Sequence, residues 1–377
     1  MISEPSTFKK LVNPNLTEPE VYVPGLTSAE AARRYHIPPE KIIKMSSNEN
    51  PLGPPPLAVR AVEKMVGELH RYPDSKAHTL REAIAMREGL SWENVICGAG
   101  SSELMSFIIR AFSNPGDEVV SMDPSFSVYT ELAKADGRTS VLIKLSHPFE
   151  LRLEDVGRVL TDRTRVIFMT RPNNPTSRLL PLDLLEQVAE LAKSAVVVSE
   201  EAYIEFADDY RQQSAADAVL RHENVIVTRT FSKAYGIPSL RIGYALAPRE
   251  AIEYLLRVKP KWNVGGVAQE AAIGALADTA HFRKSLDVVR EGRAFLSDAF
   301  NIMDGMEVLP NPQGNFIMVK VSDTGLDAEA FTEALGEQGI LIRGDFLKEY
   351  VRISVGTMLE NKKLVAASKR ILAHLSQ

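Results

Sequence analysis

The stretch NVIVTRTFSK, from Asn224 to Lys233, places a short apolar run directly before a cluster of polar side chains. Its first part, Asn224–Thr228, has the length and the β-branched composition of a buried strand. Similar runs occur earlier in the chain at Asn94–Cys97, Glu118–Met122, Ser140–Leu145, Val166–Met169 and Ala195–Val198. Longer helical patterns, such as Ser102–Phe112 and Pro181–Lys193, separate several of these runs. The alternation predicts an α/β domain with a mainly parallel sheet.

The pattern changes after Gly265. A long Ala-rich stretch, Val267–Ala299, has a helical pattern. Further strands are expected at Asn315–Val321 and Tyr350–Val355, and further helices at Ala328–Gln338 and Lys362–Leu375. We therefore predict a large domain over residues 46–265 and a smaller α/β domain over residues 266–377, with residues 1–45 packing on the smaller one.

Composition excludes several classes of protein. The 377 residues are 45% hydrophobic and 25% charged, which is typical of a folded globular chain. A net charge of -5, with 44 basic and 49 acidic residues, predicts no binding to nucleic acid or to an anionic membrane surface. The chain has no uninterrupted apolar stretch long enough for a membrane helix, and Met1–Lys10 does not resemble a signal peptide. The single cysteine, Cys97, suits a reducing compartment, so we expect a cytoplasmic protein.

Polar residues follow four of the predicted strands, where open parallel sheets bind their ligands. These residues are Gly98-Ala99-Gly100-Ser101-Ser102, Arg171–Thr176, Ser199-Glu200-Glu201-Ala202-Tyr203, and Thr230–Lys233 with Arg241. Small residues at a helix N-terminus favour a phosphate, and an arginine adds charge-assisted hydrogen bonds to it. A lysine with a neutral amine can bond covalently to a carbonyl carbon, and a buried carboxylate can keep a pyridine nitrogen protonated. Pyridoxal phosphate requires this set of groups.

Seven motifs occur in one order along the chain: Tyr22–Gly25, Asn48–Gly53, Arg71–Asp74, Gly100–Glu103, Asn173–Thr176, Ser232–Ala234 and Val351–Gly356. In these motifs the chain resembles the fold-type I pyridoxal-phosphate aminotransferases, and among them the histidinol-phosphate aminotransferase group. The resemblance implies a homodimer that transfers an amino group from a small donor, histidinol phosphate, to a 2-oxo acid, 2-oxoglutarate.

The resemblance also implies a role for each matching residue. Lys233 would bind the cofactor covalently and move the proton, and Glu200 would face the pyridine nitrogen. Phe126 would stack on the ring, while Asn174 and Tyr203 would bond its hydroxyl oxygen. The phosphate would be held by Ser101, Ser102, Thr230, Ser232 and Arg241, together with Tyr72 of the neighbouring subunit. The anionic group of the substrate would be anchored by Tyr22, Arg343 and Arg352.

Two positions depart from the family pattern. Glu200 replaces the usual aspartate, and Ser177 replaces a glycine that suits a tight turn. Glu200 leaves the reaction outcome open, so an oxidase on the same scaffold stays as an alternative. An aromatic amino-acid aminotransferase, which would use Arg352 for an α-carboxylate, and a threonine-phosphate decarboxylase, which shares nearly every motif, are further alternatives.

Simpler interpretations also stand beside these roles. Ser101 or Ser102 would be an ordinary helix cap, Phe126 a core aromatic, and Arg352 a solvent-facing strand residue. Only one of Glu200 and Glu201 is expected to point into the sheet edge. A non-catalytic ligand-sensing module is a further alternative, but the early motifs leave little room for a DNA-binding domain. The histidines show no metal-ligand spacing, so no metal is expected.

Overall fold

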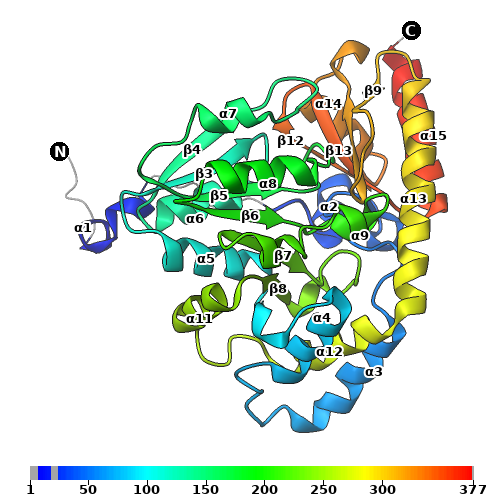
Figure 1. The fold of residues 1–377 in the computed structure, drawn as a ribbon. Coiled ribbons are helices and arrows are strands. Elements are labelled where there is room, and N and C mark those ends of the chain that lie inside the picture. The colour runs from blue at the N-terminus through cyan, green and yellow to red at the C-terminus, as the bar shows by residue number, and fades with distance from the viewer. Residues whose placement is uncertain (1–6, 18–23, 376–377) are drawn as a thin grey trace.

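A computed structural model of the chain describes residues 7–17 and 24–375 (Figure 1). Its centre is a seven-stranded sheet in which six strands run in the same direction and β8 runs in the opposite direction. In spatial order the strands are β2 (Val95–Gly98), β8 (Gly243–Leu246), β7 (Val225–Thr230), β6 (Val196–Glu200), β5 (Thr164–Thr170), β3 (Glu118–Asp123) and β4 (Thr139–Lys144). The predicted α/β fold and its six strands are confirmed, and β8 is the strand that the sequence pattern did not predict.

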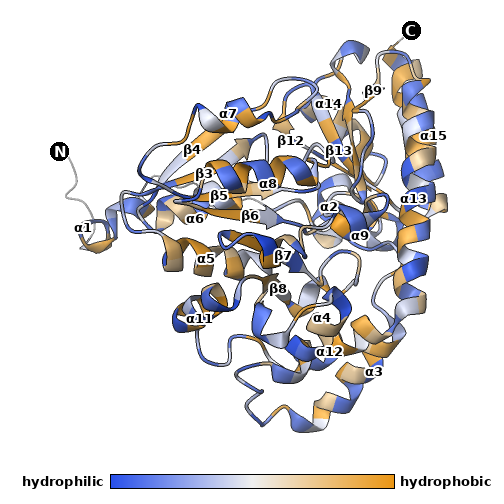
Figure 2. Ribbon diagram, in the orientation of Figure 1, coloured by the Kyte–Doolittle hydropathy of each residue, from blue (hydrophilic) through white to orange (hydrophobic). Residues whose placement is uncertain are grey.

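Helices cover both faces of this sheet, which explains why most of its strands are buried, whereas the edge strand β4 has Thr139, Leu142 and Lys144 exposed. One face packs against α5 (Ser101–Phe112), α6 (Val128–Ala135) and α11 (Arg249–Val258). The other packs against α4 (His78–Glu88), α8 (Leu182–Leu191) and α12 (Gly266–Ala277). In Figure 2 the strands of the sheet are mostly orange or pale, whereas α8 alternates between orange and blue along its length.

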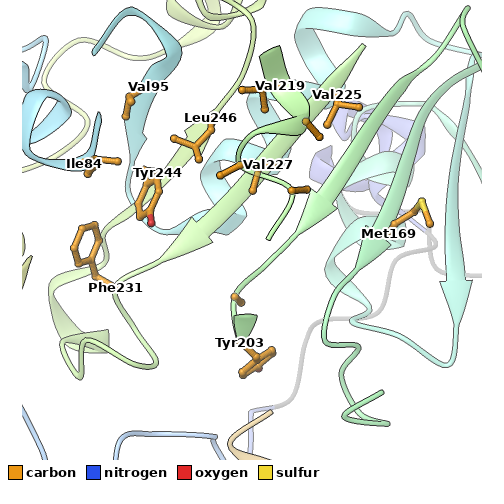
Figure 3. Packing of buried hydrophobic residues seen from close by; sticks show 14 of the residues in the cluster. Ile84, Val95, Met169, Tyr203, Val219, Val225, Val227, Phe231, Tyr244 and Leu246 are labelled. Atoms are coloured by element: carbon orange, nitrogen blue, oxygen red, sulfur yellow. The ribbon is translucent and has the colours of Figure 1, made fainter. Parts of the chain in front are cut away.

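Alternate residues of each strand enter opposite clusters. Val225 and Val227 of β7 pack on the α4 and α8 side, while Ile226 packs on the α5 side. Figure 3 shows the first of these clusters, with Leu246 of β8 between Val95 of β2 and the two valines of β7.

The predicted helical stretch Val267–Ala299 is confirmed as helical, but Asp278 divides it into α12 and α13 (Thr279–Asn301). The Asp278 carboxylate accepts a hydrogen bond of 3.2 Å from the backbone N–H of His281 and so caps α13. It also accepts one of 3.1 Å from the N–H of Leu57, next to the start of α3 (Pro56–Met65). The two helices therefore meet at a fixed corner.

A second unit is built on a four-stranded antiparallel sheet in the order β12 (Arg343–Leu347), β13 (Tyr350–Ser354), β10 (Phe316–Lys320), β9 (Glu307–Val308). Beside it, β1 (Ile43–Lys44) of the N-terminal segment pairs in parallel with β11 (Ile340–Leu341). The helices of this unit are α2 (Ser28–Tyr35), α14 (Ala328–Gly336) and α15 (Met358–Leu375).

The long helix α13 connects the two units along one side of the molecule (Figure 1). Val289 belongs to the cluster of the large sheet, whereas Leu296 and Phe300 belong to the cluster of the second unit. The packing of the large sheet thus extends beyond Gly265, and the boundary there stays a prediction.

The remaining helices are short: α1 (Thr7–Leu11), α7 (Leu153–Gly157), α9 (Tyr210–Gln213) and α10 (Ala218–Arg221). Within residues 7–17 and 24–375, no helix has the length and apolar character needed to span a membrane. In the same ranges, no three His, Cys, Asp or Glu side chains gather as a metal-binding group.

Candidate active site

The predicted polar residues meet at one edge of the large sheet. Glu200 is the last residue of β6, Thr230 is the last residue of β7, and Gly98 ends β2, which lies two strands from β7 and runs parallel to it. Asn174 follows β5, the neighbour of β6 on the other side. Because these strands point the same way, residues distant in sequence are delivered to a common rim.

Lys233 lies on this rim, three residues after β7. Its Nζ donates a hydrogen bond of 2.9 Å to the carbonyl oxygen of Ser47 and lies 5.6 Å from the centroid of the Tyr203 ring. Burial, followed by the positive charges of Arg352 and Arg241, lowers the pKa of the amine to about 7. A large share of Lys233 is therefore neutral near neutral pH, as a nucleophilic amine must be.

Glu200 is the carboxylate at the rim, and it is 3% exposed. It accepts a hydrogen bond of 3.1 Å from the backbone N–H of Ala202, and the Tyr129 hydroxyl lies 3.5 Å from its other oxygen. Burial raises the pKa of Glu200 to about 8, although the Ala202 hydrogen bond opposes this. A cationic ring nitrogen beside it would favour the ionised form.

Glu201 points away from the rim into a buried ion-pair network. Its two oxygens contact Arg171 at 3.2 Å and Arg229 at 3.0 Å, and all three side chains are almost fully buried. Arg229 also pairs with Glu88 at 3.0 Å. Glu200 is therefore the glutamate that lies at the rim, and Glu201 has a structural role.

The first turn of α5 forms a cradle with Arg241. The cap residue of α5 is Gly100, with φ of +86°, so the interpretation of Ser101 or Ser102 as the cap is wrong. A Cβ atom on Gly100 would lie 2.6 Å from Nη2 of Arg241, so the guanidinium would have to shift, and the φ of +86° disfavours other residue types. Arg241 also contacts Ser232 Oγ at 3.5 Å. The start of α5, Ser232 and Arg241 thus bring together backbone N–H groups, a hydroxyl and a guanidinium, which are groups of the types that bind phosphate.

Thr230 supports this cradle from the end of β7. Its hydroxyl oxygen accepts a hydrogen bond of 3.0 Å from the N–H of Ser232 and so fixes the turn before Lys233.

A second group of polar residues connects the rim to β13. Arg352 donates a hydrogen bond of 2.7 Å to Oδ1 of Asn174 and another to the carbonyl oxygen of Ser46. Arg352 is 6% exposed, so its interpretation as a solvent-facing residue is wrong. The Tyr203 hydroxyl accepts a hydrogen bond of 3.2 Å from Asn48.

The other predicted site residues differ in position. Arg343 lies directly opposite Arg352 across the β12–β13 pair. Phe126 follows β3 and is half-buried, with its ring 6.1 Å from that of Tyr129. Tyr72 is 80% exposed, and its ring lies 4.7 Å from that of Trp262. Tyr22 lies outside the described residues.

Ser177 keeps the conformation that favours glycine, with φ of +61°. Its hydroxyl oxygen accepts a hydrogen bond of 2.8 Å from the N–H of Gly314, so the serine connects the two units.

Comparisons with known proteins agree with this geometry. The family model for "Aminotransferase class I and II" matches residues 40–367, most of the chain. The chain belongs to this family. The enzyme is 36% identical to a histidinol-phosphate aminotransferase of Akkermansia muciniphila, over 97% of this chain and 100% of the relative. It is 37% identical to the one of Methanosarcina mazei, over 95% and 96% of the two chains.

A solved structure shows the same architecture. The histidinol-phosphate aminotransferase of Sinorhizobium meliloti, in complex with pyridoxal-5'-phosphate, has a TM-score of 0.84 and 25% identity, and the match covers 97% of this chain and 98% of that chain. Like its family, this aminotransferase uses pyridoxal phosphate. The residues fit the cofactor, because the Gly100 cradle suits its phosphate, Glu200 suits its ring nitrogen and Lys233 suits its aldehyde.

Three contributors to the site were not identified from the sequence. They are the Ser47 carbonyl on Lys233, the Asn48 amide on Tyr203, and the Tyr129 hydroxyl near Glu200. Asn48 opens one of the seven motifs, so a signal was present for it. The Ser47 carbonyl is a backbone group and has no sequence signal.

Proposed function

We propose that this aminotransferase takes its amino group from histidinol phosphate and passes it to 2-oxoglutarate. The observation that carries the proposal is Lys233, an amine with a pKa of about 7 on the same rim as Glu200, with Arg352 of β13 hydrogen-bonded to Asn174 of that rim. The choice of donor is supported by relatives of that name at 36–37% identity over nearly the whole chain.

The chain's own residues divide the chemical work. Bound pyridoxal phosphate supplies an electron sink for the bonds of the donor's α-carbon. The neutral Lys233 amine would take the proton from that carbon and deliver it to the carbon atom of the cofactor that receives the amino group. Glu200 keeps a positive charge on the ring nitrogen, and Tyr129 and the Ala202 N–H hold its carboxylate.

The donor's anionic end is assigned to Arg343 and Arg352. Guanidinium groups form bidentate hydrogen bonds with both phosphate and carboxylate. The same two arginines can therefore bind the phosphate of the donor and a carboxylate of the dicarboxylate acceptor. Arg352 also donates to Asn174, which connects this end to the cofactor end of the site.

The proposal includes a homodimer in the cytoplasm, with Tyr72 reaching the cofactor phosphate of the partner subunit. Tyr72 is 80% exposed and packs against Trp262, which is 44% exposed, and Leu69 nearby in sequence is 67% exposed. A cluster of exposed apolar side chains suits a protein partner. Tyr72→Phe tests the assignment. Light scattering is expected to show that the dimer persists, whereas the affinity of the variant for pyridoxal phosphate is expected to be lower.

The visible absorption spectrum of the cofactor-loaded enzyme, recorded with histidinol phosphate and no oxo acid, tests the donor. We expect the band of the pyridoxal form to convert to that of the pyridoxamine form, and 2-oxoglutarate to restore it. Phenylalanine and threonine phosphate are the comparison compounds. Conversion with either of them, but not with histidinol phosphate, would refute the proposed donor.

A further inference from the structure

The hairpin β12–β13 gathers two arginines around one aromatic ring. Arg343 and Arg352 are paired residues of the two strands. Their guanidinium carbons lie 5.2 Å and 4.9 Å from the centroid of the Phe346 ring. Two positive charges thus lie at the end of the site assigned to the donor's anion.

One of these arginines is already held by a carboxylate. Arg343 Nε donates a hydrogen bond of 2.7 Å to Oδ1 of Asp345, and Nη2 donates to Oδ2. The Arg343 side chain is 11% exposed and that of Asp345 is 57% exposed. The pair is bidentate, which is the geometry that a substrate phosphate would itself adopt with Arg343.

We propose that Asp345 is a specificity-determining residue that sets how strongly this end of the site binds a phosphate rather than a carboxylate. The inference rests on the proposed function. With Asp345 ionised, two positive charges and one negative charge face the donor, which suits a singly charged carboxylate. A phosphate monoester, with a charge of about -2 near neutral pH, must displace the Asp345 carboxylate from Arg343 and then lie near it.

The exposure of Asp345 makes this displacement possible. Pairs with an exposed carboxylate are weak, so the carboxylate can turn into solvent when a phosphate arrives. After it has turned away, the Asp345 carboxylate still repels the bound phosphate. Coulomb repulsion between charges a few ångströms apart lowers the affinity for phosphate by roughly three- to tenfold. Asp345 thereby limits the affinity for a phosphorylated donor and its phosphorylated product.

Asp345→Asn tests the inference, because asparagine keeps one acceptor for Arg343 and loses the charge. Glu349→Gln is the matched control, since it removes one exposed negative charge from the same hairpin without contacting Arg343. For Asp345→Asn we expect KM for histidinol phosphate to fall by about three- to tenfold, with little change in KM for unphosphorylated histidinol. Glu349→Gln is expected to leave both values near those of the unmodified enzyme.

A binding measurement separates this effect from turnover. Inorganic phosphate is titrated into the cofactor-loaded enzyme by calorimetry, since the cofactor then fills its own phosphate site. Tighter binding by about three- to tenfold in Asp345→Asn alone supports the inference. Unchanged binding, or weaker binding because Arg343 loses its support, overturns it. Failure of the unmodified enzyme to react with histidinol phosphate would instead refute the proposed function, while the phosphate titration would still test Asp345.

Discussion

Glu201→Gln is expected to destabilise the protein strongly, although Glu201 does not face the active site. The Glu201 carboxylate compensates two buried guanidinium groups, those of Arg171 and Arg229. It also accepts a hydrogen bond of 2.7 Å from the N–H of Ala215. Glutamine has nearly the same shape, but its amide nitrogen would place a donor against these donors and leave a buried positive charge uncompensated.

The magnitude follows from the ion pairs that are lost. Removing one partner of a buried pair costs about 3–5 kcal/mol, and the value stays in this range because Arg229 keeps its pair with Glu88. For 377 residues the entropy of unfolding is about 0.8 kcal/mol/K, so we expect the melting temperature to fall by about 4–6 °C. Thermal unfolding of the cofactor-free protein, followed by circular dichroism at pH 7, measures this change.

Glu200→Gln is the matched control at the adjacent position. Burial raises the pKa of Glu200 to about 8, so without cofactor the carboxyl is mostly protonated at pH 7 and an amide replaces it at little cost. The cofactor-free variant is expected to melt within about 1 °C of the unmodified protein, while its activity with cofactor falls. Equal melting temperatures for Glu201→Gln and Glu200→Gln would refute the division of roles between the two glutamates.

Two further predictions concern the cofactor. The rate at which cofactor-free protein binds pyridoxal phosphate covalently should rise with pH through about 7 and then level off, because burial lowers the pKa of Lys233 and only the neutral amine reacts. Stopped-flow absorbance measures this rate, and a rise that continues toward the ordinary lysine pKa of 10.5 would contradict it. Gly100→Ala should weaken cofactor binding by about tenfold or more, because its Cβ would lie 2.6 Å from Arg241 and its φ is +86°. Gly116→Ala is the control for equilibrium dialysis, since Gly116 has a φ of +90° and no atom within 4 Å of the added Cβ.

The central sheet was predictable because most of its strands are buried on both faces and therefore contain apolar runs, as β2 and β7 show. The missed strand, β8, has four residues, begins with a glycine and runs antiparallel to its neighbours. The segment between β7 and β8 contains only the 3-10 turn Pro238–Leu240 and no α-helix, so the strand–helix alternation gives no sign of β8. The break at Asp278 was missed for a different reason, since an aspartate can lie within a helical pattern or cap a new helix.

The candidate site was predictable in its residue types but not in its pairings. Successive strand residues point to opposite faces, so Glu200 and Glu201 had to diverge, but the side of each depends on Arg171 and Arg229 from other segments. The pair between Arg343 and Asp345 likewise depends on side-chain positions at the hairpin. Such contacts are set by tertiary packing, which spacing along the chain does not encode.

The most direct test of the account is to identify the residue that holds the cofactor. The loaded enzyme is reduced with borohydride, digested, and analysed by mass spectrometry for peptides that carry the reduced pyridoxyl group. We predict one modified site, Lys233, and its absence in Lys233→Ala protein that is folded by circular dichroism. Modification of a different lysine, or no modification of a protein that turns over, would contradict the assignment of the active site.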